Sequence, residues 1–113
     1  MKHWKKAEEQ AVLSLVSENY QIVDTNWRTP LVEIDIICQR DTNIYFVEVK
    51  HRVNEATGSG IEAISNKKLR QMTKAANLWI IEHDCRQQPF LGVIVLSGDQ
   101  FQISDWLLPL TGV

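Results

Sequence analysis

Two stretches of the chain place apolar side chains at intervals of three and four residues. The first covers residues 3–18 and the second residues 66–82, and this spacing gathers the apolar groups on one face of a helix. Ser65 precedes the second stretch, where its hydroxyl can cap the first turn. We therefore predict two amphipathic helices. Their apolar faces comprise Trp4, Ala7, Ala11, Val12, Leu15 and Val16 in the first helix, and Leu69, Met72, Ala76 and Ile80 in the second.

Short apolar runs between and after these helices predict strands. They are rich in β-branched residues, which favour extended structure. One of them is apolar throughout, as expected for a strand buried on both faces of a sheet; it covers residues 90–96. The predicted strands are residues 20–24, 31–38, 44–53, 90–96 and 101–103.

Polar segments separate these strands. Residues 39–43 predict a turn that joins the second and third strands as an antiparallel hairpin. Residues 26–30 contain Pro30 and predict a connection, and residues 54–60 predict a glycine-containing loop. The order α-β-β-β-α-β-β predicts a mixed α/β fold.

Length and composition are those of an ordinary globular protein. We expect a single domain over residues 1–113, because 44% of the chain is apolar and 23% is charged. The longest apolar runs fall far short of the roughly 18 residues of a membrane helix, and the basic start does not continue into the apolar core of a signal peptide.

Cys38 and Cys85 lack the spacing of a zinc site or disulfide framework. We therefore expect reduced thiols and a cytoplasmic location.

Charged residues are unevenly distributed along the chain. The formal net charge of -2 argues against nucleic-acid binding by bulk attraction. Between residues 50 and 74, however, basic residues outnumber acidic ones by four. This local excess predicts either a phosphate-binding surface or an ordinary solvated helix face.

Asp35 is an acid inside an apolar strand. Side chains alternate along a strand, so Asp35 is expected to share a face with Leu31, Glu33 and Ile37, opposite the face of Val32, Ile34, Ile36 and Cys38. On the paired strand, the same alternation places Glu48 and Lys50 side by side, on the face of Ile44 and Phe46.

Two carboxylates on neighbouring strands, with a lysine two residues after the second, suit a divalent cation. Mg²⁺ or Mn²⁺ takes oxygen ligands, so Asp35, Glu48 and the main-chain carbonyl of Val49 are the candidate metal ligands. Lys50 is the candidate cation that stabilises charge in a phosphodiester transition state. The alternative is a structural salt bridge between Glu48 and Lys50, because strand residues that face solvent often carry alternating charges that pair in this way.

Glu8 interrupts the apolar face of the first helix, between Trp4 and Ala11. A buried acid is costly unless it is paired, hydrogen-bonded or bound to a metal. We therefore add Glu8 to the candidate catalytic residues. The histidines His3, His51 and His83 lack the mutual spacing of a metal site, and we expect structural or surface roles for them.

Three segments carry a resemblance to a known family. Residues 7–11 (Ala-Glu-Glu-Gln-Ala), 32–37 (Val-Glu-Ile-Asp-Ile-Ile) and 46–52 (Phe-Val-Glu-Val-Lys-His-Arg) resemble those of the YraN-like family, within the PD-(D/E)XK nuclease superfamily and similar to archaeal Holliday junction resolvases. The Asn26-Trp27-Arg28 element and Lys68 with Ala76 match as well, so the resemblance spans residues 4–82.

The resemblance implies a restriction-endonuclease-like fold with Asp35, Glu48 and Lys50 as the core site and Glu8 as an accessory acid. Resolvases dimerise to cut two strands symmetrically, so the resemblance makes a homodimer one possible arrangement, and the sequence leaves the oligomeric state open. Two positions depart from the family pattern, since Val32 replaces a glycine and Leu91 replaces an acid. Neither is a candidate metal ligand.

Two functions compete at this point. The first is an endonuclease that acts on branched or otherwise structured DNA with Mg²⁺ or Mn²⁺. The second is a catalytically inactive module of the same fold that binds nucleic acid or protein. For either, the candidate nucleic-acid contacts are Arg28, Arg52, Lys67, Lys68 and Arg70.

Overall fold

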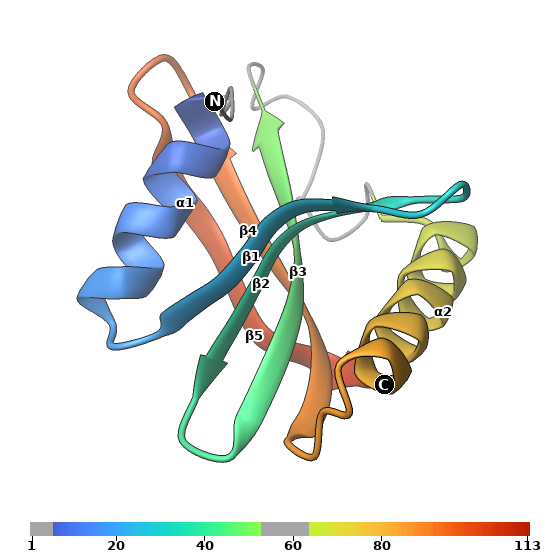
Figure 1. Cartoon of the computed structure of the whole chain (residues 1–113). Helices are drawn as coiled ribbons and strands as arrows, with labels where there is room; N and C mark the ends of the chain where they lie inside the picture. The colour runs from blue at the N-terminus through green and yellow to red at the C-terminus, as the bar shows by residue number, and fades with distance from the viewer. Residues whose placement is uncertain (1–5, 53–63) are drawn as a thin grey trace.

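A five-stranded mixed sheet stands between two helices in the computed structural model, which describes residues 6–52 and 64–113 (Figure 1). The predicted order of elements is confirmed. In chain order they are α1 (Lys6–Ser17), β1 (Gln21–Arg28), β2 (Glu33–Arg40), β3 (Asn43–Arg52), α2 (Asn66–Glu82), β4 (Gln88–Ser97) and β5 (Gln102–Gly112).

The strands lie in the sheet in their chain order. The first three form an antiparallel meander, and β3 and β4 pair in parallel. Because parallel strands need a long crossover, α2 connects them across one face of the sheet. β5 then returns antiparallel to β4. This mixed topology agrees with the predicted restriction-endonuclease-like fold.

One helix covers each face of the sheet (Figure 1), and each face has its own apolar core. On one face, Ala11 and Leu15 of α1 pack on Ile36, Val47 and other strand residues. On the opposite face, α2 packs on the sheet through a second cluster that includes Trp79. As predicted, β4 is buried on both faces over most of its length, since it contributes to both cores.

The ends of the helices follow from local backbone chemistry. Beyond the last turn of α1, Asn19 adopts a left-handed φ of 67°, a conformation that asparagine tolerates better than most residues. The side chain of Ser65 accepts a hydrogen bond of 3.0 Å from the backbone N–H of Lys68, which confirms Ser65 as the N-cap of α2. Neither helix in the described part of the chain is long and apolar enough to cross a membrane.

Two predicted boundaries are wrong. The segment 26–30 is not a connection throughout, because β1 continues to Arg28, where it pairs with Glu33 of β2. The last strand extends far beyond residue 103 because it follows β4 along most of its length. Pro109 lies between the paired residues Leu107 and Thr111, at a register shift of an edge strand, where a missing N–H is tolerated. Residues 1–5 and the predicted loop 54–60 lie outside the described residues.

Candidate active site

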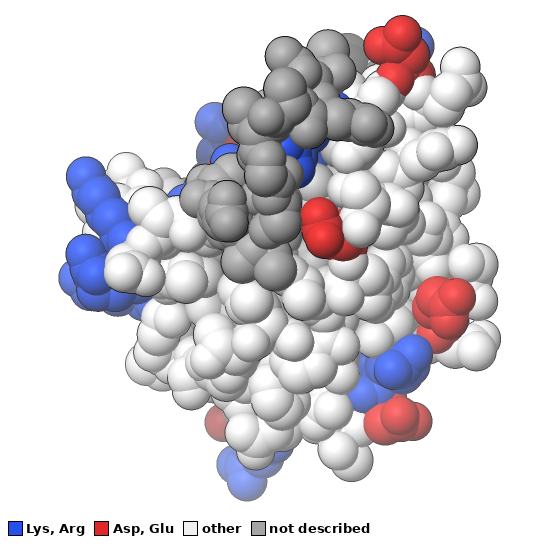
Figure 2. Space-filling view, turned by 180° about the vertical axis from the view of Figure 1, so that it is seen from behind, with Lys and Arg blue, Asp and Glu red and all other residues white. Residues whose placement is uncertain are grey.

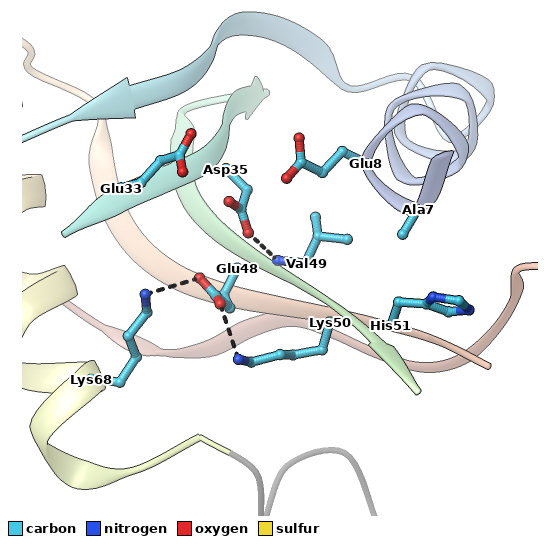
Figure 3. A pocket seen from close by; sticks show the side chains of 9 residues that line it. All are labelled: Ala7, Glu8, Glu33, Asp35, Glu48, Val49, Lys50, His51 and Lys68. Carbon is cyan, nitrogen blue, oxygen red and sulfur yellow. Dashed lines mark hydrogen bonds and ion pairs between the residues drawn. The ribbon is translucent and has the colours of Figure 1, made fainter. Parts of the chain in front are cut away.

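A pocket of about 380 Å³ opens between α1, the β2–β3 pair and the beginning of α2 (Figure 3). Its lining combines four acids with two lysines. All four candidate catalytic residues are among them. The pocket is lined by Ala7, Glu8, Glu33, Asp35, Glu48, Val49, Lys50, His51 and Lys68.

The side chain of Asp35 takes the place of a backbone contact between β2 and β3. The two strands are paired from Arg40 to Ile36 on β2, and beyond that point Oδ2 of Asp35 accepts a hydrogen bond of 2.8 Å from the backbone N–H of Val49. The regular alternation of β2 is interrupted here, since Ile34 packs in the α2 core and Ile36 in the α1 core. The prediction that these two residues share a face is therefore wrong.

The surroundings of Asp35 raise the pKa of its carboxyl above the ordinary value. The residue is only 9% exposed, and burial raises the pKa of its carboxyl to about 7, helped by the negative charge of Glu48. The hydrogen bond from Val49 acts in the opposite direction, while the charges of Glu8 and Glu33 raise the pKa further. The carboxylates of the pocket therefore repel one another, and a positive charge bound among them would relieve this repulsion.

Glu48 stands between the two lysines of the pocket. Lys50 Nζ lies 3.5 Å from Glu48 Oε1 and Lys68 Nζ lies 3.6 Å from Glu48 Oε2. The predicted alternation of β3 is confirmed, because Ile44 and Phe46 pack in the α2 core, on the face from which Lys68 of α2 reaches Glu48 (Figure 3).

Glu8 is held by a residue that the sequence did not single out for this role. Glu8 is buried on α1, and its Oε2 accepts a hydrogen bond of 2.9 Å from the side-chain amide of Asn26 on β1. Asn26 lies across from Asp35, because the adjacent residues of the two strands are paired. The strand that pairs with the strand of Asp35 thus supplies the hydrogen-bond partner of Glu8.

The donors in the pocket suit a hard divalent cation. Within residues 6–52 and 64–113, no three or more His, Cys, Asp or Glu side chains converge closely enough to hold a metal together. Mg²⁺ and Mn²⁺ sites commonly use one or two carboxylates, with water and substrate phosphate completing the shell. Asp35, Glu48 and the carbonyl of Val49 fit that pattern, since all three residues line one pocket.

The candidate nucleic-acid contacts fall in different places. Arg28 is exposed and lies 3.6 Å from Glu33 in an ion pair, and Arg52 is the last residue of β3. Lys67 and Arg70 are exposed on α2. Lys68, by contrast, lines the pocket.

His51 also lines the pocket. Its Nε2 lies 2.9 Å from the carbonyl oxygen of Gly98, and its ring stacks on Phe101 at 4.4 Å. These contacts hold the ring against the β4–β5 turn. They agree with the structural role expected for this histidine.

The mixed sheet between two helices, with carboxylates from adjacent strands meeting in a pocket, defines a restriction-endonuclease-like α/β protein. Comparisons with known proteins then give its family. The model of the uncharacterised protein family UPF0102 matches residues 7–96.

Relatives in several bacteria bear the same family name. A UPF0102 protein of Sulfurihydrogenibium sp. is 40% identical over 94 residues, which cover 82% of this chain and 82% of the relative. One from Vibrio parahaemolyticus is 41% identical over 91 residues, covering 80% of this chain and 71% of the relative. The chain therefore belongs to UPF0102, the YraN-like family, which is a PD-(D/E)XK nuclease-like family, and the resemblance stated above is confirmed.

Proposed function

We propose that this protein is a metal-dependent endonuclease that hydrolyses phosphodiester bonds in DNA, with branched or otherwise structured DNA as the expected substrate. One observation carries the proposal. Asp35 and Glu48 approach each other from adjacent strands in a pocket that also contains Lys50. Oxygen ligands beside a fixed cation are what metal-assisted phosphodiester hydrolysis requires.

Each pocket residue has a role in this proposal. Asp35, Glu48 and the carbonyl of Val49 would hold Mg²⁺ or Mn²⁺, which supplies a Lewis acid and lowers the pKa of a bound water. Lys50 neutralises the charge that develops on the phosphate oxygens. Glu8, oriented by Asn26, accepts a hydrogen bond from the attacking water. The nearby apolar cores keep these groups in place.

A second candidate function is a non-catalytic module that binds nucleic acid or protein. The observation in its favour is that Glu48 already has a lysine near each of its oxygens, so the pocket can balance part of its charge without a metal. A purely structural cluster of this kind needs no divalent cation.

Calorimetric titration with Mn²⁺ separates the two functions. The wild type should bind Mn²⁺, and Asp35→Asn should lose that binding while remaining folded, because asparagine retains an oxygen that can accept from Val49. Equal binding by both proteins would show that the metal site lies elsewhere. A wild type that binds no metal at all would favour the non-catalytic module.

The exposed basic side chains of α2 are the proposed DNA-binding face. Figure 2 shows Lys and Arg side chains gathered at the edge of the molecule that α2 forms, beside a largely uncharged face. Lys67 and Arg70 are exposed there. Replacing both with glutamine should reduce the salt dependence of DNA affinity by about two units of slope, roughly one per lost phosphate contact.

The matched control for this experiment is Arg86→Gln. Arg86 is exposed beyond the far end of α2 and pairs with Asp84 at 3.6 Å. Its replacement should leave the salt dependence of DNA affinity unchanged. If the double variant also keeps the wild-type slope, Lys67 and Arg70 form an ordinary solvated helix face.

The hydrogen bond from Asn26 to Glu8 gives a further prediction. Asn26 has a left-handed φ of 53°, which glycine adopts without strain, so Asn26→Gly removes the amide donor and preserves the backbone. Cleavage should fall by about tenfold because Glu8 loses its fixed orientation. Asn19→Gly is the control, since Asn19 has a similar φ of 67° at the end of α1. Equal cleavage rates for the two variants would contradict this role for Asn26.

A further inference from the structure

The pocket contains a second lysine from a separate element of the fold. Lys68 belongs to α2, its side chain is 29% exposed, and its Nζ lies 3.6 Å from Glu48 Oε2. Lys50 lies near the other oxygen of the same carboxylate at 3.5 Å. Figure 3 shows the two lysines reaching Glu48 from different directions. Each carboxylate oxygen of the proposed metal ligand therefore has a lysine nearby.

The position of Lys68 in α2 is unfavourable for the helix itself. It is the third residue after the N-cap Ser65 and receives the capping hydrogen bond through its backbone N–H. Glutamate or glutamine is favoured at this position, and a cation in the first turn opposes the helix dipole. The first turn of α2 contains no acid to offset that cost. The long basic side chain is thus better explained by its contact in the pocket than by helix stability.

A divalent cation bound to Glu48 would repel the ammonium groups of both lysines. Metal binding should therefore weaken the contact of Glu48 with at least one of them. Lys50 follows Glu48 by two residues on the same rigid strand. Lys68 is anchored on another element, and its flexible four-carbon stem can swing away without disturbing the sheet.

We propose that Lys68 is an exchangeable partner of Glu48, which it neutralises in the metal-free pocket and releases when a divalent cation binds, so that its ammonium group then binds a phosphate oxygen of the nucleic-acid strand. This inference rests on the proposed function. Without DNA, Lys68 competes with the metal for Glu48. With DNA bound, Lys68 contacts the substrate. Metal and DNA then bind cooperatively through one side chain.

The test variant is Lys68→Met, which keeps the apolar stem and removes the charge. In calorimetry without DNA, its Mn²⁺ affinity should be about threefold to tenfold higher than that of the wild type, because one competing cation is gone. In the presence of Mn²⁺, its DNA affinity should be lower, with the salt dependence reduced by about one unit of slope. A thermal melt checks that the variant is folded.

Two further variants separate exchange from a general charge effect. Lys67→Met removes an adjacent exposed lysine, so it should reduce the salt slope of DNA binding without changing Mn²⁺ affinity. Lys68→Arg keeps the charge and should keep the wild-type Mn²⁺ affinity. If Lys68→Met binds Mn²⁺ no more tightly than the wild type, the exchange is wrong while the metal site stands. If the wild type binds no Mn²⁺, the proposed function fails together with the exchange.

Discussion

Replacing Lys50 with alanine is expected to lower the rate of DNA cleavage by about a hundredfold to a thousandfold, while DNA binding remains close to that of the wild type and metal binding is not weakened. This is the magnitude typical of losing one group that stabilises charge in a transition state. Lys50 lines the pocket beside Glu48 and would act on charge that develops only as the phosphodiester bond breaks. Such a group contributes to turnover more than to ground-state affinity.

The geometry also separates this role from a structural one. If Lys50 served only as an ion-pair partner of Glu48, its removal would cause no specific loss of cleavage. Lys68 remains 3.6 Å from the same carboxylate, so Glu48 keeps a partner in Lys50→Ala and the melting temperature should change little.

Single-turnover cleavage of branched DNA with Mn²⁺, alongside thermal melts, measures both quantities. Arg86→Ala is the control, because Arg86 is exposed beyond the end of α2, where it pairs with Asp84, and does not line the pocket. Undiminished cleavage by a folded Lys50→Ala protein would overturn the assignment of Lys50.

The second large effect concerns Asp35 and the stability of the metal-free protein. Its carboxyl has a pKa of about 7 in the folded chain against an ordinary value of 3.8, so the folded state binds a proton more tightly than the unfolded state does. Stability from this group is therefore fully present below about pH 4 and is lost as the pH rises through about 7. At neutral pH the ionised carboxylate should cost about 2 to 4 kcal/mol.

Asp35→Asn removes this ionisation and keeps an oxygen for the N–H of Val49. In denaturant unfolding of the metal-free proteins, the variant and the wild type should be similarly stable near pH 4, and the variant should gain an advantage as the pH rises to 7. Mn²⁺ should stabilise the wild type at pH 7 and leave the variant unchanged.

Asp41→Asn, in the exposed β2–β3 turn, is the control and should show no such advantage. A difference between Asp35→Asn and the wild type that stays constant from pH 4 to 7 would contradict the electrostatic account of the pocket.

The order of the elements could be predicted from the sequence because it rests on local periodicity. The alternation of β3 is confirmed for the same reason, with Phe46 and Glu48 on the α2 side. The extents of β1 and β5 could not be predicted, because pairing with β2 and β4 overrides the local signals of residues 26–28 and Pro109.

The pocket was only partly predictable for a different reason. Asp35, Glu48 and Lys50 stand out as charged residues in apolar strands, and they do line one pocket. The contacts of Asn26 with Glu8 and of Lys68 with Glu48 join residues far apart in the chain, which periodicity does not reveal. The break in the alternation of β2 was also hidden, because it occurs where β3 donates a hydrogen bond to the side chain of Asp35, a contact between strands that local periodicity does not reveal.

The most direct test of the central proposal is the rate at which the purified protein cleaves a panel of linear, nicked and branched DNA molecules, measured against Mn²⁺ concentration for the wild type and Asp35→Asn side by side. The account predicts cleavage by the wild type that requires Mn²⁺ and saturates with it, and loss of that cleavage in Asp35→Asn. Cleavage at equal rates by the two proteins, or no cleavage of any substrate by the wild type, would contradict it.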